Sequence, residues 1–155
     1  MTTEAEQKQI IKGITLHRPW GYAIAHLNKR VENRTYNCPL PIGSYLAIHN
    51  GKKWDEEGAD FVCRMNPSEL IDNPTDKTDS PSQIIAIAKF VGNVTECDSE
   101  WFQPGGVGWL LEDVMAIIPV ECKGQQGLWN LGVDVLIQVR DNYREAVDMI
   151  RREGW

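Results

Sequence analysis

Long apolar segments are absent from this sequence. No run of about 18 apolar residues occurs, which is roughly the length that a membrane-spanning helix requires, so we expect no membrane span. The opening residues, MTTEAEQKQIIKG, are polar and acidic, and they lack the basic and then apolar pattern of a secretory signal peptide. We therefore expect a cytoplasmic protein.

Metal and cofactor motifs are also missing. The cysteines, Cys38, Cys63, Cys97 and Cys122, form no CxxC or CxxxC pair, which argues against a structural zinc site. In a reducing compartment we expect them to be small buried hydrophobic residues. No HxH pair and no Ser, His, Asp order is visible that would indicate a metal site or a catalytic triad. The sequence therefore predicts no metal ion and no cofactor.

Two glycine-rich turns lack the patterns of phosphate-binding loops. The stretches PGGVGW and KGQQGLW have neither the GK[ST] ending of a P-loop nor the GxGxxG spacing of a dinucleotide fingerprint. Each turn adjoins a tryptophan, Trp109 in the first and Trp129 in the second. Such aromatic residues can stack on nucleobases, although they more often pack in a core with the indole N–H satisfied. Both roles stay open at this point.

Negative charge dominates the chain, but it is unevenly distributed. Residues 1 to 53 carry eight Lys and Arg against three Asp and Glu, a net of +5, whereas residues 54 to 155 carry eight against nineteen, a net of −11. An acidic protein repels polyanions in general. A basic N-terminal third can still form a local anion site, so we expect a footprint of one or a few nucleotides and not a long duplex.

The length of 155 residues and the apolar content of 42% fit a single domain, residues 1 to 155, with a sizeable core. Alternating and helical periodicities predict strands and helices at irregular intervals, which favours an α+β fold over a βαβ series. The predicted helices are 18–30, 54–65 and 134–152, and the predicted strands are 31–36, 43–50, 82–97 and 108–122.

Four details accompany these elements. Asn28 is expected to end the first helix, and the last strand is expected to be interrupted near Glu112 and Asp113. Asp134 is expected to cap the last helix, whose apolar positions are Leu136, Val139, Tyr143, Val147 and Ile150, although a strand is a competing interpretation of its first turn. The segment 66–82, NPSELIDNPTDKTDSPS, is predicted to be a long surface loop, and a loop of that length is either functional or mobile.

The stretch NKRVENRTYN, residues 28–37, contains the most chemically versatile cluster. Lys29 supplies a point charge with three donors, and Arg34 a planar fork that suits phosphate or carboxylate. Glu32 can accept from a base amino group, orient Lys29, or act as an acid or base. A simpler interpretation is that Glu32 pairs with Arg34 on a solvated strand face, because structural ion pairs are common.

Several blocks together resemble the ASCH domain, named for activating signal cointegrator homology, of the PUA-like superfamily. The segment LHRPWGYAIAHLNKRVENRTY is similar to the opening motif, SYLAIHN to the strand that ends in a histidine, and WFQPGGVGWLLEDVMAIIPVECKGQQGLWNL, residues 101–131, to a pattern of the bacterial branch. The resemblance covers about residues 13 to 131. It implies an α+β fold with a small mixed β-barrel, flanking helices, and a cleft that holds Lys29, Glu32 and Arg34.

The resemblance also implies recognition of single-stranded RNA, a nucleotide or a modified nucleobase. The nucleotide-binding residues implied or proposed on this basis are Arg18, Trp20, Lys29, Glu32, Asn33, Arg34, His49, Trp109 and Trp129. His49 ends an otherwise apolar strand, and a lone histidine is more often a structural group than a catalyst. The sequence leaves open whether the ligand is RNA, DNA or a free nucleoside.

An alternative is a hydrolase in the same cleft, with Lys29, Glu32 and Arg34 as the catalytic residues. One branch of the family removes an acyl group from N4-acetylcytidine through a Lys-x-x-Thr motif, and here Glu32 stands in the place of the threonine. Another relative resembles a ribonuclease, and a metal-independent route would use Lys29 or Glu32 as base and Arg34 to stabilise the phosphate. A third hypothesis is a protein-interaction adaptor that uses the 66–82 loop.

Overall fold

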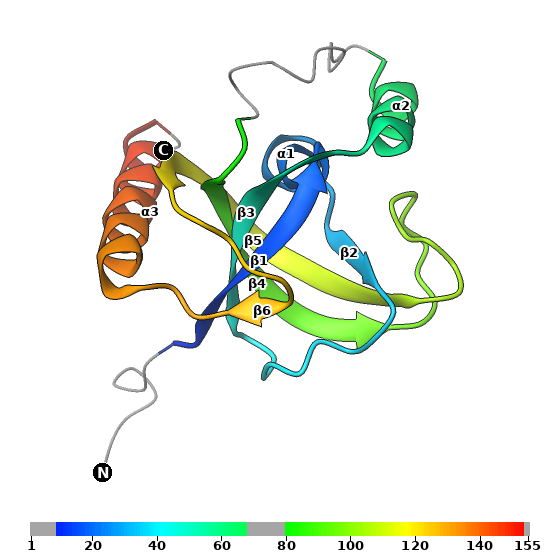
Figure 1. Ribbon diagram of the computed structural model, residues 1–155, viewed down its shortest axis with the longest axis horizontal. Helices are drawn as coiled ribbons and strands as arrows, with labels where there is room; N and C mark the ends of the chain where they lie inside the picture. The colour runs from blue at the N-terminus through cyan, green and yellow to red at the C-terminus, as the bar shows by residue number, and fades with distance from the viewer. Residues whose placement is uncertain (1–8, 68–79, 154–155) are drawn as a thin grey trace.

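The computed structural model describes residues 9–67 and 80–153 as a curved sheet with three helices (Figure 1). The elements follow the order β1 (Ile11–Arg18), α1 (Trp20–His26), β2 (Val31–Arg34), β3 (Tyr45–Trp54), α2 (Glu56–Met65), β4 (Gln83–Val94), β5 (Val107–Glu121), β6 (Leu128–Trp129) and α3 (Val133–Glu153). The α+β class and the order of the predicted elements are confirmed.

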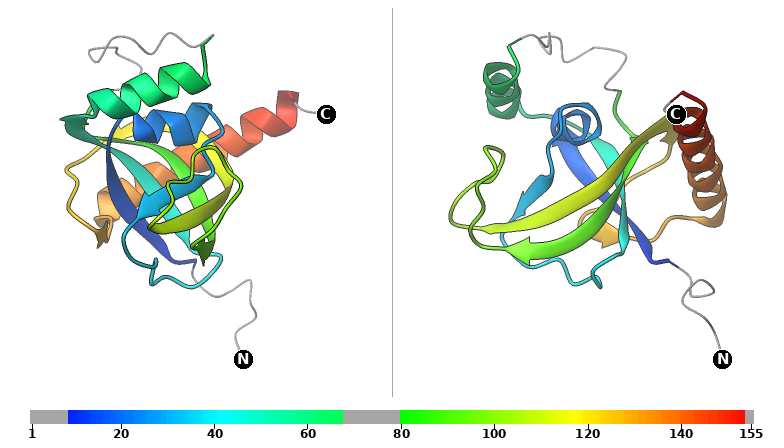
Figure 2. Two further views of the ribbon diagram at one scale, coloured as in Figure 1. Left: turned by 90° about the vertical axis from the view of Figure 1, so that its right-hand side faces the viewer. Right: turned by 180° about the vertical axis from the view of Figure 1, so that it is seen from behind.

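The six strands form one sheet in the order β2-β5-β4-β3-β1-β6. β1 pairs with β3 in parallel, and the remaining pairings are antiparallel. Figure 2 shows that the long strands β4 and β5 curve strongly around the interior. Within the described residues the two edge strands, β2 and β6, are not hydrogen-bonded to each other, so the sheet is open. The prediction of a closed β-barrel was therefore wrong, and a curved open sheet takes its place.

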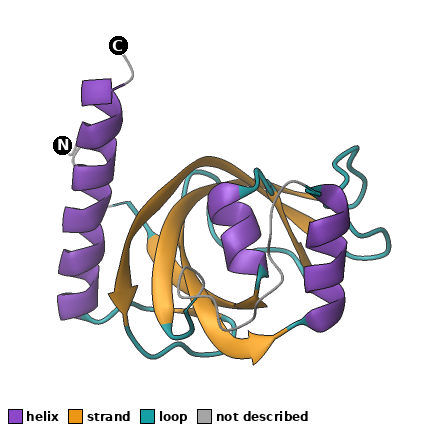
Figure 3. Cartoon of the chain, turned by 90° about the horizontal axis from the view of Figure 1, so that it is seen from above, coloured by secondary structure: helices purple, strands orange, loops and turns teal. Residues whose placement is uncertain are grey.

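Helix α1 covers part of the curved sheet. It packs against β1, β4 and β5, and Figure 3 shows it seated over the curved sheet. Its Ala23 and Ile24 side chains are fully buried. The helix starts after Pro19, and Asn28 follows its end with a φ of 62°, a left-handed conformation that Asn tolerates and that helices do not continue. Asn28 thus ends the helix as predicted, although the helix itself is shorter than predicted.

Strand β5 runs without interruption from Val107 to Glu121, so the predicted break is instead a local irregularity. Asp113 has a φ of 48°, and the pairing register with β4 shifts between Ile87 and Lys89 on the facing strand. A bulge of this kind bends a strand without ending it. The bend contributes to the curvature that surrounds the core.

Helix α3 begins at Val133, which rules out the alternative of a strand for its first turn. Asp134 lies within the first helical turn and not at the cap position, so the prediction that it caps the helix was wrong. Val139 is buried and Tyr143 packs against the same cluster, whereas Ile150 is 54% exposed. The predicted apolar stripe therefore contacts the sheet in the first part of the helix only, because the last turns extend beyond the strands (Figure 2).

The core consists of three apolar clusters that together line both sides of the sheet. One includes Trp109 and Phe90, the second lies under α3, and the third joins α1 and α2 through Val62 and Trp101. All four cysteines are free; Cys38 is buried and the other three are half-buried. Most of the predicted 66–82 loop, residues 68–79, lies outside the described residues. None of the described helices has the length and apolar content of a membrane span.

Candidate functional site

The Lys29–Arg34 stretch runs from the turn after α1 into the edge strand β2 and includes that strand. The left-handed Asn28 turns the chain, and the backbone N–H of Lys29 donates to the Ala23 carbonyl at 3.1 Å. The Arg30 guanidinium donates to the Ile24 carbonyl at 2.9 Å, which satisfies a carbonyl near the end of α1. These local contacts fix the direction in which Lys29 and Glu32 point.

Lys29, Glu32 and Arg34 form one linked charge cluster. The Lys29 Nζ lies 3.3 Å from Glu32 Oε1, and the Arg34 Nε donates to Glu32 Oε2 at 3.0 Å. The Lys29 residue is 2% exposed and the Glu32 residue 8%. The predicted Glu32–Arg34 pair exists, but its carboxylate is buried and not on a solvated face, because Lys29 covers the other oxygen.

The environment of Lys29 is unusual for an ammonium group. Its Nζ also donates to the Val31 carbonyl at 2.6 Å and lies 5.4 Å from the centre of the Trp20 ring. Burial lowers the pKa of Lys29, the nearby Arg34 lowers it further, and Glu32 acts in the opposite direction. A buried lysine with a depressed pKa in a cleft is a candidate functional group.

A cleft of about 560 Å³ opens directly over this cluster. Its lining comes from α1, β2, α2 and the segment 100–104, and it comprises Trp20, Lys29, Glu32, Asn33, Asp55, Glu57, Gly58, Phe61, Arg64, Glu100, Trp101, Phe102, Gln103 and Pro104. Four aromatic rings therefore stand around a buried polar floor. The volume lies within the range of small-molecule sites.

The charge of the cleft differs from the sequence-based expectation. Its lining holds two cations, Lys29 and Arg64, and four carboxylates, a formal net charge of −2. Including Arg34, which binds Glu32 beside the cleft, the sum is −1. The basic N-terminal third does not produce a strongly cationic cleft, because α2 and the 100–104 segment add acidic side chains to it.

Asp55 joins the helix α2 to the aromatic wall. As the N-cap of α2 it accepts the Gly58 N–H at 2.8 Å, and its other oxygen accepts the Trp20 indole N–H at 2.9 Å. These hydrogen bonds, led by the one from Gly58, hold the pKa of Asp55 below its usual value. Trp20 is therefore held in place by a charged acceptor and packs against Phe61 with ring centres 6.2 Å apart.

Asn33 fixes the opposite wall. Its side-chain amide donates to the Trp101 carbonyl at 2.9 Å, and its side-chain oxygen accepts the Gln103 N–H at 2.9 Å. Both ends of the amide thus bind the backbone of the 100–104 segment. The role of Asn33 in the structure is to position this segment, and with it Trp101 and Phe102, beside the cluster.

Two predicted site residues lie away from the cleft. Arg18 donates to the carbonyls of Gly51 at 3.2 Å and Lys52 at 3.0 Å, and its guanidinium lies 5.8 Å from the Trp54 ring centre. His49 is buried, with Nδ1 3.1 Å from the Thr15 hydroxyl and Nε2 2.8 Å from the Cys122 carbonyl. Burial lowers the pKa of His49, which keeps its ring neutral, and the lining of the cleft does not include it.

The two tryptophans beside the glycine-rich turns are core residues. Trp109 is fully buried and donates its indole N–H to the Tyr36 carbonyl at 2.8 Å. The Arg34 guanidinium lies 5.6 Å from its ring centre, so Trp109 packs against the arginine of the charge cluster. Trp129 is 6% exposed and packs edge-on against His49. The structure therefore places neither ring in the cleft as a stacking surface.

Other residues of the cleft had not been predicted. Phe61 and Arg64 belong to α2; the sequence pattern indicated only that Phe61 faces inward, and nothing in it singled out Arg64. Trp101 and Phe102 stand at the start of the quoted WFQPGG block, which was the one available signal for them. In the described parts of the chain no group of three or more His, Cys, Asp or Glu side chains is placed to hold a metal ion.

The structure is similar to crystal structures of an ASCH domain. The crystal structure of ASCH from Zymomonas mobilis is 13% identical, with a TM-score of 0.54 over 86% of this chain and 96% of that one. Two mutant proteins of the same domain are each 15% identical, with TM-scores of 0.54 and 0.52, over 86% of this chain and 98% and 96% of theirs. No family model matches the sequence, and no curated protein does. The chain has the fold of the ASCH domain.

Proposed function

We propose that this protein binds the base of single-stranded RNA or of a modified nucleoside in the cleft above Lys29 and Glu32. The observation that carries the proposal is the combination of four aromatic side chains, Trp20, Phe61, Trp101 and Phe102, with a buried donor and acceptor on the floor. Bases of single-stranded RNA are usually recognised by stacking on aromatic rings and by hydrogen bonds to their edges.

The floor has hydrogen-bonding capacity left for a ligand. Of the three protons of the Lys29 ammonium, one is donated to Val31 and one to Glu32, which leaves one for a base carbonyl or ring nitrogen. Each oxygen of Glu32 accepts one bond and retains a further lone pair for an amino group. A neighbouring donor and acceptor match the alternating pattern at the edge of a nucleobase.

The acidic lining favours the base over the phosphate as the group that enters. With a formal net charge of −2, the cleft would repel a polyphosphate chain. Arg34, whose side chain is 22% exposed beside the cleft, is placed to meet a phosphate at its rim. The proposed footprint is accordingly one inserted base with one or two flanking phosphates outside.

A titration followed by nuclear magnetic resonance tests the proposal. Cytidine, N4-acetylcytidine and short single-stranded RNA are added to labelled protein, and the indole N–H signals of Trp20 and Trp101 are expected to shift. Phe61→Ala should weaken binding by roughly tenfold or more, since stacking on one ring contributes about 1–3 kcal/mol per base. Tyr36→Ala, which removes an exposed aromatic outside the cleft, is the matched control. Unchanged spectra at millimolar ligand would contradict the proposal.

A second candidate is a hydrolase in the same cleft, and the depressed pKa of Lys29 is the observation that favours it. A lysine whose pKa is lowered by burial gives up its proton more readily, and beside a carboxylate it can serve as a general base. Labelled RNA and a panel of N4-acylated cytidines would be incubated with the protein and with Lys29→Ala, each with and without chelator. Product that disappears in Lys29→Ala identifies an enzyme, and the substrate consumed identifies its class. Binding without product leaves a nucleotide-binding protein.

A further inference from the structure

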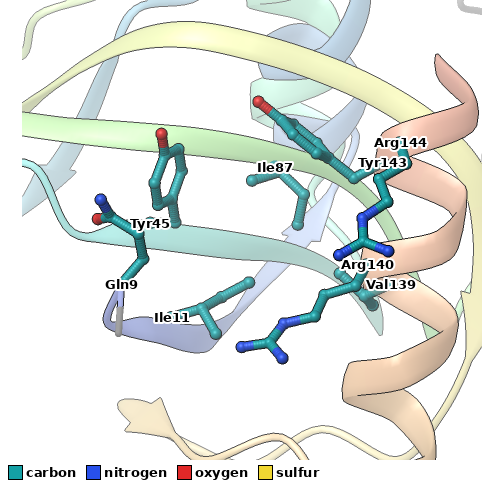
Figure 4. A pocket seen from close by; sticks show the side chains of 8 residues that line it. All are labelled: Gln9, Ile11, Tyr45, Ile87, Val139, Arg140, Tyr143 and Arg144. Atoms are coloured by element: carbon teal, nitrogen blue, oxygen red, sulfur yellow. The ribbon is translucent and has the colours of Figure 1, made fainter. Parts of the chain in front are cut away.

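A second pocket lies between helix α3 and the sheet, and it shares no lining residue with the cleft. It has a volume of about 310 Å³ and is lined by Gln9, Ile11, Tyr45, Ile87, Val139, Arg140, Tyr143 and Arg144 (Figure 4). We call it the helix pocket. It exists because α3 packs chiefly against β5, so that the helix overhangs the first residues of β1 and β3.

The floor of the helix pocket is apolar. Ile87 and Val139 are buried members of the core cluster under α3, and Ile11 packs against that cluster. The rings of Tyr45 and Tyr143 stand beside Ile87 and pack on the same cluster (Figure 4). A ligand that fills this space would gain contact with aliphatic and aromatic carbon and would cover apolar surface that solvent now reaches.

The charged groups of the helix pocket are all positive. Arg140 and Arg144 are one turn apart on α3, and Figure 4 shows both guanidinium groups reaching from the helix over the strands. Within residues 9–67 and 80–153 neither guanidinium has a hydrogen bond or an ion pair, and the lining holds no carboxylate. In a chain of net charge −6, two unpaired arginines at one apolar pocket mark a place for an anion.

The two tyrosines of the pocket add hydrogen-bond donors to its positive charges. Burial, followed by the neighbouring Tyr45 and Asp113, raises the pKa of Tyr143, so its phenol stays protonated and can donate a hydrogen bond. Asp113 is the carboxylate that influences this phenol, but it is 68% exposed, lies 4.0 Å from Lys89 and is not part of the lining. Every polar side chain that lines the pocket can therefore donate a hydrogen bond to an acceptor atom of a ligand.

We propose that the helix pocket is a binding site for a small organic anion with a compact apolar body, whose anionic group binds Arg140 and Arg144 and whose body lies on Ile11, Ile87 and Val139. A planar guanidinium binds a carboxylate or phosphate in a fork, which fixes orientation as well as adding energy. The pocket volume admits only a small ligand and not a folded partner. This site is independent of the base-binding cleft and carries the opposite formal charge.

The probe for the proposal is 4-phenylbutyrate, and 4-phenylbutanamide is its uncharged counterpart. Methyl resonances of Ile11, Ile87 and Val139 are followed during titration of the full chain with each. The carboxylate is expected to bind in the millimolar range or tighter, as fits a ligand of about a dozen non-hydrogen atoms, and the amide about tenfold more weakly or worse. Equal affinities, or no shift with either compound, would overturn the proposal.

Two pairs of variants complete the test. Arg140→Gln/Arg144→Gln should remove the preference for the carboxylate, and because both side chains are exposed the fold should survive, which thermal unfolding checks. Arg151→Gln/Arg152→Gln removes the same charge from the same helix outside the pocket and should leave the preference intact. If the second pair abolishes it equally, or if inorganic phosphate binds as tightly as 4-phenylbutyrate, the proposed ligand class is wrong.

Discussion

The Lys29 ammonium and the Glu32 carboxylate lie 3.3 Å apart at the floor of the cleft, with side chains only 2% and 11% exposed. Removing two charges from water is costly, and their mutual attraction offsets this cost only when the remaining donors and acceptors are satisfied. Here the Val31 carbonyl and Arg34 satisfy part of that need, and the rest is open to a ligand. The pair is therefore at once a structural contact and the polar surface that a ligand would meet.

Replacing Glu32 by Gln should destabilise the fold by about 2 kcal/mol or more, because Lys29 and Arg34 then lack their carboxylate in a buried site. Urea unfolding measures the loss. The double variant Lys29→Met/Glu32→Gln should recover part of it, since the uncompensated ammonium is gone. A loss within about 0.5 kcal/mol, the level of an exposed ion pair, would show that the cluster is solvated in solution.

Replacing Asp55 by Ala should lower the free energy of unfolding by about 1 kcal/mol, the usual contribution of an N-cap. Asp55→Asn, which keeps an acceptor oxygen, should cost less. Since the folded pKa of Asp55 is depressed, its charge stabilises the fold above the unfolded value near pH 4, and this contribution is lost as the pH falls further. The difference between wild type and Asp55→Asn should accordingly shrink in acid, and a constant difference would contradict the assignment.

The stability of the protein should decrease as the pH falls below about 6.5, in part because of His49. Its folded pKa is lowered by burial, so at mildly acidic pH the unfolded chain binds a proton that the folded chain does not. The contribution is complete above the unfolded pKa and is lost as the pH falls through the folded pKa. Chemical unfolding at a series of pH values measures the slope, and His49→Gln should make it shallower. An unchanged slope would mean that His49 is accessible to protons in the fold.

Replacing Gly58 by Ala should destabilise the protein, although the same change in most helices is stabilising. A Cβ at this position would lie 2.6 Å from the Trp20 ring, which the hydrogen bond to Asp55 holds in place. We expect α2 to shift away from Trp20. Nucleoside binding should then weaken, although the substitution changes no polar group of the cleft. The pair Asp60→Ala and Asp60→Gly, at an exposed position of the same helix, is the comparison for helix propensity alone. A more stable Gly58→Ala variant with normal binding would show that Trp20 moves freely.

Most elements of secondary structure were predictable from local patterns. The apolar spacing of α1 and α3, the Pro19 start and the Asn28 end are properties of neighbouring residues, and they are found in the structure within a few residues. The interactions of Lys29, Glu32 and Arg34 were predictable for the same reason, because these residues are at most five positions apart. The expectation of a barrel failed, since closure requires pairing between the edge strands β2 and β6, which are far apart in the sequence, and no local pattern decides that pairing.

The chemistry of the candidate site was thus present in one short segment of the sequence, which supplies the lysine, the carboxylate and the arginine. Only the tertiary structure decided that α2 and the 100–104 segment complete the cleft with aromatic rings and with enough carboxylates to make it acidic. It also decided that Trp109, Trp129 and His49 are buried in the core while Trp20 lines the cleft. The residue type sets what a side chain can bind, but contacts between distant segments determine whether solvent or a ligand can reach it.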